Sequence, residues 1–105
     1  MHRSKGDGEV ALRIKDRDRA VSIAIKASRI DRDLSQNQIA QSMGWSSEVI
    51  SNIEKTRRNV TVSELIAIAE AMGEDPEEIF RRILQWRRRR PRSATKGATA
   101  RSAYD

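Results

Sequence analysis

The stretch Leu34–Glu54, LSQNQIAQSMGWSSEVISNIE, holds the start and end signals of two short helices. Ser35 is placed to accept the backbone N–H of Gln38, whose side chain can bond back to the cap, and this predicts a capping box. Gly44 can end that helix in the left-handed conformation, and Ser46 offers a second N-cap two residues later. Two helices joined by so short a turn form a helix-turn-helix, whose second helix can lie in the major groove of DNA.

A longer helical pattern precedes this stretch. Apolar and small side chains recur near one stripe between Val10 and Ile30. We expect the packed part of this helix to begin near Asp16 or Asp18, with residues 10–15 as a frayed or appended turn. Residues 1–9 have almost no apolar side chains, so we expect a flexible arm there. The stripe comprises Ile14, Val21, Ala24, Ile25, Ala27 and Ser28.

Two more helices follow the stretch. Thr61 and Glu64 form the pattern of a second capping box, and Gly73 can end the helix that they begin. Asp75 can cap a last helix that has Pro76 at its first position, where the missing N–H costs nothing. The prediction is therefore an all-α fold, a compact domain of five helices without strands.

The last helix carries more apolar residues than packing on its own domain requires, which suggests a protein partner. We place a dimer contact at Ile83, Leu84 and Trp86. We expect the helix to run on through the arginines Arg87, Arg88, Arg89 and Arg90 until Pro91 ends it.

The charge is concentrated at the C-terminal end. The 105 residues carry a net charge of +6, but residues 1–86 hold 14 basic and 14 acidic side chains, so the excess lies in residues 87–105. We divide the chain into residues 1–15, an N-terminal arm or helix extension, residues 16–86, a helix-turn-helix domain, and residues 87–105, a basic and disordered tail. Such a tail indicates a polyanionic partner. Nucleic acid fits the motif, with a membrane surface as the alternative. We expect the tail arginines to bind DNA without sequence preference.

The composition also excludes several kinds of chemistry. The chain has no cysteine and one histidine, so we expect no disulfide, no metal site and no cofactor. No paired carboxylates, nucleophile–base set or phosphate-binding glycine loop stands out, and we do not expect an enzyme. No apolar run is long enough to span a bilayer, which predicts a cytoplasmic protein.

A series of short sequence words between residues 20 and 84 resembles the Cro/CI-type helix-turn-helix family of phage and bacterial repressors, also called the XRE family. The words are Leu34-Ser35-Gln36, Ile39-Ala40, Met43-Gly44, Ser46, Ile50-Ser51, Ile53-Glu54, Leu65, Ile68-Ala69, Ala71-Met72-Gly73 and Ile79-Phe80. The resemblance implies a lambda-repressor-like domain in the bacterial cytoplasm or nucleoid. It also implies binding to double-stranded DNA, usually as a symmetric homodimer on inverted half-sites.

In similar proteins, the positions that face the DNA groove match Ser47, Glu48 and Asn52, and the buried isoleucines of this helix agree with that orientation. Asparagine can read adenine, glutamate can accept from cytosine, and serine is permissive. Glu48 has three open roles. It could specify cytosine, be held by Arg57 or Arg58, or stabilise the start of its helix through the helix dipole.

Two further matches concern residues that contact the second helix of the motif, which is called the recognition helix. Gln36 matches a glutamine that touches phosphate or braces a side chain of that helix, and we group it with the base-reading residues; a plain first-turn helix residue is the alternative. Arg29 matches an arginine that pairs with the equivalent of Glu54. The pair could leave guanidinium N–H groups for a phosphate, or could be only an ion pair.

The loop after the recognition helix matches the segment that binds phosphate in the family. Thr56 stands where glycine is usual and Val60 where proline is common, so the sequence determines the conformation of this loop less firmly. Trp45 replaces a small aliphatic residue, and we expect it to cover the core instead of stacking on bases. Besides Arg29, the expected phosphate contacts are Ser51, Arg57, Arg58, Asn59 and Thr61.

The sequence therefore predicts a DNA-binding transcriptional regulator, a repressor that binds a palindromic operator through a dimer. The alternative is the antitoxin of a toxin–antitoxin pair that also regulates its own operon. Against that alternative, the tail has almost no large apolar residues with which to bind a toxin.

Overall fold

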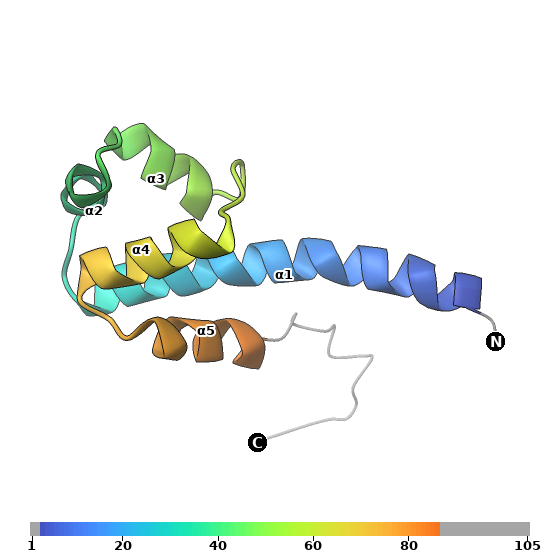
Figure 1. Cartoon of the computed structure of the whole chain (residues 1–105). Helices are drawn as coiled ribbons and strands as arrows, with labels where there is room; N and C mark the ends of the chain where they lie inside the picture. Colours follow the sequence, from blue (N-terminus) through green and yellow to red (C-terminus); the bar gives the residue numbers. More distant parts are fainter. Residues whose placement is uncertain (1–2, 87–105) are drawn as a thin grey trace, which may run out of the picture.

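The structure is a computed structural model that describes residues 3–86, with side chains placed from residue 13 onward. Within this range the fold is all-α, as predicted. Figure 1 shows α2 and α3 together at one edge of the molecule, α4 beside α1, and α5 at the opposite edge. The five helices are α1 (Arg3–Asp31), α2 (Gln36–Met43), α3 (Ser47–Glu54), α4 (Val62–Met72) and α5 (Pro76–Gln85).

The predicted cap residues begin and end the short helices. Capping boxes are present at Ser35 and Thr61, each of which accepts the N–H of the third helical residue. Gly44 and Gly73 end α2 and α4 with φ angles of 74° and 78°, which residues with a Cβ rarely adopt. Ser46 is the N-cap of α3, but its side chain makes no capping hydrogen bond.

The core lies where α1 meets α3, α4 and α5 and extends to α2. The largest buried side chains are isoleucines contributed by all five helices. A buried polar contact joins α1 to α3, because the Ser22 hydroxyl donates to the Ile53 carbonyl at 2.8 Å. The isoleucines with almost no exposure are Ile25, Ile39, Ile50, Ile53, Ile68 and Ile79.

The first helix is longer than expected. We expected a flexible arm over residues 1–9, or a helix extension over residues 1–15, and α1 runs without interruption from Arg3 to Asp31. Extending an existing helix adds one hydrogen bond per residue and does not require the new turn to be buried. The packed part begins near the expected position, with Ala20 as the first fully buried side chain. Ile14 is exposed, so it does not belong to the buried stripe.

The last helix is shorter than expected. It ends at Gln85, and Trp86 has an extended backbone while its ring packs against the core. The Ile83 carbonyl, which would accept the N–H of residue 87 in a longer helix, accepts from Arg17 Nη1 at 3.1 Å and from the Trp86 N–H. The prediction that the helix continues into four arginines is therefore wrong at Trp86. Arg87 to Arg90 lie outside the described residues.

Residues 3–86 contain neither a membrane-spanning helix nor a cluster of metal ligands. No helix there is long and apolar enough to cross a membrane. The same residues contain no cluster of His, Cys, Asp or Glu that could hold a metal ion.

Candidate nucleic-acid interface

The α3 helix lies at an edge of the molecule (Figure 1). Ile50 and Ile53 fix its orientation because both are fully buried. Ser47 and Glu48 are consequently exposed in the first turn, and Asn52 lies half-buried one turn later. Within residues 3–86, the side chains of these three residues make no hydrogen bond or ion pair, so their donors and acceptors are available to a ligand.

The surroundings of Glu48 exclude one of the three roles that the sequence left open for it. Arg58 is paired with Glu64 at 3.1 Å, and no ion pair joins Arg57 to Glu48 in the described part of the chain. The role in which an arginine of the loop holds Glu48 is therefore not the one that the structure adopts. Glu48 lies in the first turn of α3, where a negative charge is favoured by the helix dipole.

A buried ionic network anchors the C-terminal end of α3. Arg29 Nε and Nη2 donate to the two carboxylate oxygens of Glu54 at 2.7 and 3.1 Å. Gln36 Nε2 donates to Glu54 Oε1 at 3.0 Å, so the amide of Gln36 is engaged in bracing the recognition helix. Arg29 Nη1 also donates to the Leu34 carbonyl at 2.9 Å. Three of the five guanidinium N–H groups are thus used, and the predicted phosphate contact is left to the other two.

The loop between α3 and α4 contains a residue with a left-handed backbone, at the position where the family usually has glycine. Thr56 adopts φ 59°, in the left-handed region where a glycine would carry no steric penalty. The backbone N–H groups of Arg57 and Arg58 both donate to the carbonyl of Asn52, at 2.8 and 3.2 Å. The loop is therefore bonded directly to the last turn of the recognition helix.

The predicted phosphate-binding residues of this loop differ in availability. Arg57 and Asn59 have exposed side chains, whereas Arg58 is half-buried and three of its five guanidinium N–H groups bond protein groups. The Thr61 N–H donates to Glu64 Oε1 and its hydroxyl accepts the Glu64 N–H, both at 3.0 Å. Any phosphate contact from Thr61 must use its hydroxyl proton.

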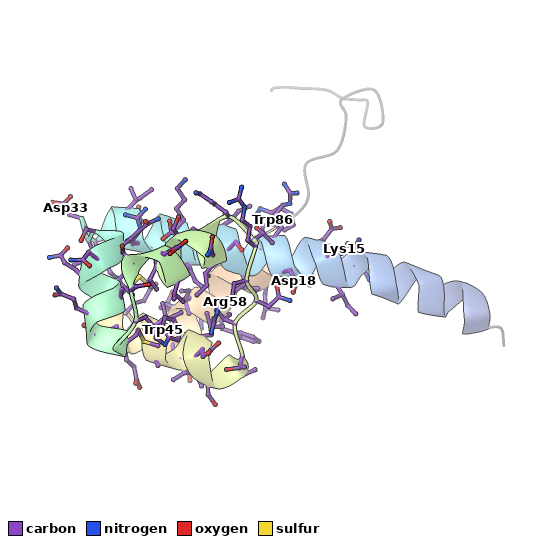
Figure 2. The ribbon with its side chains drawn as sticks, turned by 90° about the horizontal axis from the view of Figure 1, so that it is seen from above. Lys15, Asp18, Asp33, Trp45, Arg58 and Trp86 are labelled. Carbon is purple, nitrogen blue, oxygen red and sulfur yellow. The ribbon has the colours of Figure 1, made fainter. Side chains whose placement is uncertain are left out.

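Sequence reasoning missed a contact set around Arg58. Its guanidinium lies over the ring of Trp45, 4.9 Å from the centroid, and makes a two-point pair with Glu64. Figure 2 shows Trp45 and Arg58 close together. Trp45 also packs against the core, as predicted. Hydrogen bonds from Arg58 and from the Thr61 backbone hold the pKa of Glu64 below its ordinary value. An arginine six residues before an acidic N3 residue was the available sequence signal.

The predicted dimer residues have unequal exposure. Ile83 is buried in the core of the protomer, so it offers no surface to a partner and we remove it from the predicted contact. Trp86 is half-buried, whereas Leu84 is exposed beside a groove of about 460 Å³ between α4 and α5. Sequence reasoning placed no α4 residue in the contact. The apolar side chains of this groove are Val62, Leu65, Ile66, Phe80 and Leu84.

Comparison with known proteins agrees with this geometry. The HTH_3 family model, described as helix-turn-helix, matches residues 25–79. The chain belongs to the XRE-type helix-turn-helix family. XRE-type proteins are DNA-binding transcription regulators, and the predicted family is thereby confirmed.

Solved structures of other regulators share the fold. The clp gene regulator ClgR from C. glutamicum is 19% identical, with a TM-score of 0.61 over 65% of this chain and 88% of that one. The restriction-modification controller protein C.AhdI from Aeromonas hydrophila is 23% identical, with a TM-score of 0.58 over 63% and 96%. The controller protein C.Esp1396I, solved as a tetramer with its natural 35 base-pair operator, is 26% identical, with a TM-score of 0.57 over 66% and 96%. No curated protein matches the chain by sequence.

Proposed function

We propose that this protein is a transcriptional repressor that binds a palindromic operator as a homodimer, with α3 in the major groove. The observation that carries the proposal is the polar face of α3, whose side chains have no protein partner within residues 3–86. Its opposite face is fixed by buried isoleucines and by the Arg29–Glu54 network. A rigid helix with unsatisfied polar groups on its outer face is what reading of base edges requires.

Each exposed side chain of α3 has a definite recognition chemistry. The amide of Asn52 can bond N6 and N7 of adenine together, and the carboxylate of Glu48 can accept from N4 of cytosine. Ser47 can donate or accept. Glu48 would also disfavour other DNA sequences, because an unpaired carboxylate is repelled by a groove that offers it no donor.

Phosphate contacts would hold this helix in register. Arg57 is exposed beside the end of α3, and Ser51 and Asn59 lie on the same helix and loop. The arginines at 87–90 would add attraction that does not depend on sequence. Removing residues 87–105 should therefore weaken binding to all DNA sequences and reduce the salt dependence, and an unchanged salt slope would remove the tail from this proposal.

The dimer contact that we propose uses the groove between α4 and α5. Val62, Ile66, Phe80 and Leu84 are large apolar side chains that stay exposed together there. A contiguous apolar surface of this kind marks a contact between proteins. A two-fold contact would present two copies of α3 to two half-sites, which predicts an inverted repeat in the operator.

The C.Esp1396I structure supports this model, because that controller protein was solved as a tetramer bound to its operator. Repression needs only that the bound dimer covers promoter DNA. The experiment that tests the function is footprinting of the purified protein on its own promoter region. One protected inverted repeat is the expected result, together with reduced transcription from that promoter, and uniform binding without a protected site would overturn the proposal.

A single substitution tests the role of α3 in this binding. Asn52→Ala should weaken operator binding by about 1–3 kcal/mol and leave non-specific binding nearly unchanged. Gln85→Ala, an exposed amide on α5, is the matched control. Equal losses on operator and random DNA would show that Asn52 does not read a base.

A further inference from the structure

The contacts of Arg58 use three of its five guanidinium N–H groups and one face of the group. Nη1 donates to Glu64 Oε1 and to the Asn59 carbonyl, both at 3.3 Å, and Nη2 donates to Glu64 Oε2 at 3.1 Å. One face of the group covers the ring of Trp45 at 4.9 Å from the centroid. A carboxylate, a carbonyl and an aromatic ring of the protein therefore hold this group before any DNA is bound.

The three partners come from three segments around the recognition helix. Trp45 lies in the turn before α3 and Arg58 in the loop after it (Figure 2), and Glu64 lies in the first turn of α4. The contact set therefore fixes the segments at both ends of α3 relative to each other. We call these three residues the Arg58 clamp.

The loop that the Arg58 clamp holds contains a strained backbone position, so it would change conformation if the clamp were lost. Thr56 is in the left-handed region, which is strained for a residue with a Cβ. The N–H groups of Arg57 and Arg58 both converge on the Asn52 carbonyl. If the loop relaxed, Arg57 and the last turn of α3 would move together, so contacts that hold the loop also hold the DNA-facing residues.

We propose that Arg58 is a positioning residue and not a phosphate ligand: Glu64 and Trp45 hold it so that the loop presents Arg57 and α3 presents Asn52. This inference rests on the proposed DNA-binding function and revises the phosphate role that the sequence predicted for Arg58. The alternative is that DNA phosphate takes Arg58 from Glu64, in which case the carboxylate competes with DNA. The two roles predict opposite effects of removing the charge of Glu64.

Glu64→Gln is the decisive variant because it should fold. Glutamine at N3 preserves the capping box with Thr61, but it loses the ionic partnership with Arg58. We expect operator binding about two- to five-fold weaker than for Glu70→Gln, which removes an exposed carboxylate from the same helix. Binding tighter than that of Glu70→Gln would overturn the positioning role, because it would identify Glu64 as a competitor of phosphate.

The salt dependence of binding provides a second, independent measurement. Each neutralised phosphate contributes about 0.9 to the slope of log affinity against log salt. Arg57→Gln should lower the slope by about 0.9 per protomer. Arg58→Gln should lower affinity with a smaller loss of slope than Arg57→Gln, because Arg57 keeps its charge, and a loss of slope equal to that of Arg57→Gln would overturn the inference.

A measurement without DNA separates this inference from the proposed function. In a Trp86→Phe background, Trp45 is the remaining tryptophan, and its quenching by acrylamide reports how well the clamp covers it. Glu64→Gln should increase that quenching, whereas Glu70→Gln should not. Equal quenching in both variants would refute the clamp even if operator binding is confirmed. If the wild-type protein binds no specific site, the proposed function fails and the quenching result still decides whether the clamp exists.

Discussion

Loss of the carboxylate of Glu54 should destabilise the domain severely. Glu54 has only 3% of its side chain exposed, and the side chain of its partner Arg29 is 15% exposed. Glu54→Ala removes the acceptor of three hydrogen bonds and leaves a guanidinium group largely enclosed without its counter-charge. Removing one partner of a buried pair costs about 3–5 kcal/mol. Because Arg29 retains some exposure and its bond to the Leu34 carbonyl, we expect about 3 kcal/mol.

Urea unfolding followed by circular dichroism measures this loss. A domain of this size unfolds with a slope of about 1 kcal/mol per molar urea, so the midpoint should fall by about 3 M. The control is Glu48→Ala on the same helix, whose exposed carboxylate has no ion pair in the described part of the chain. That change should stay within about 0.5 kcal/mol of the wild type.

The double variant Arg29→Ala/Glu54→Ala tests whether the cost comes from the unpaired cation. Its loss should be smaller than the sum of the two single losses, because neither charge is then left alone. Additive losses, or a loss under about 1 kcal/mol for Glu54→Ala, would refute the reasoning that an enclosed ion pair holds α3 to α1.

The other predictions concern the dimer, the loop and pH. Leu84→Glu should shift the protein to monomer in sedimentation equilibrium, whereas Ile30→Glu, on α1 and equally exposed (56% against 55%), should not; a persistent Leu84→Glu dimer would reject the groove as the contact. Thr56→Gly should stabilise the domain by about 0.5–1 kcal/mol in urea unfolding, because relief of the left-handed strain exceeds the entropy cost of glycine, whereas Lys55→Gly at φ −91° should destabilise it. The pKa of Glu64 is lowered by folding, so its contribution to stability is present above its ordinary value of 4.5 and is lost as pH falls below it. The difference in melting temperature between wild type and Glu64→Gln should be constant near pH 6–7 and shrink below about pH 4.5, and a difference that grows on acidification would contradict the sign of this shift.

Much of the fold could be predicted because its signals are local. A capping residue and its N3 partner are three positions apart, and a glycine that ends a helix acts on its own backbone. Ser35, Thr61, Gly44 and Gly73 therefore marked helix ends correctly from the sequence. The isoleucine spacing of α3 likewise indicated which side of that helix would be buried and which would be exposed.

Errors arose where the outcome depends on a partner distant in the chain. The end of α5 depends on Arg17, which is 66 residues before the Ile83 carbonyl that it contacts. The burial of Ile83 itself could not be separated from that of Leu84 by periodicity alone, because the last helix carries apolar residues on more than one side. The error in the length of α1 has a different cause, because it depends on continuous local backbone bonding that composition does not reveal.

The stretch from Leu34 to Glu54 by itself determined that the protein has a helix-turn-helix and that Ser47, Glu48 and Asn52 point outward, because caps and periodicity are properties of neighbouring residues. The tertiary structure decided which polar and charged groups are already bonded within the protein. It pairs Arg29 with Glu54, as the resemblance implied, and it bonds Gln36 to Glu54 and Arg58 to Glu64 and Trp45. Arg57, which has no such partner within residues 3–86, remains available to a phosphate. The physical reason is that a charge binds whichever counter-charge folding brings within a few ångströms, and sequence order does not contain that distance.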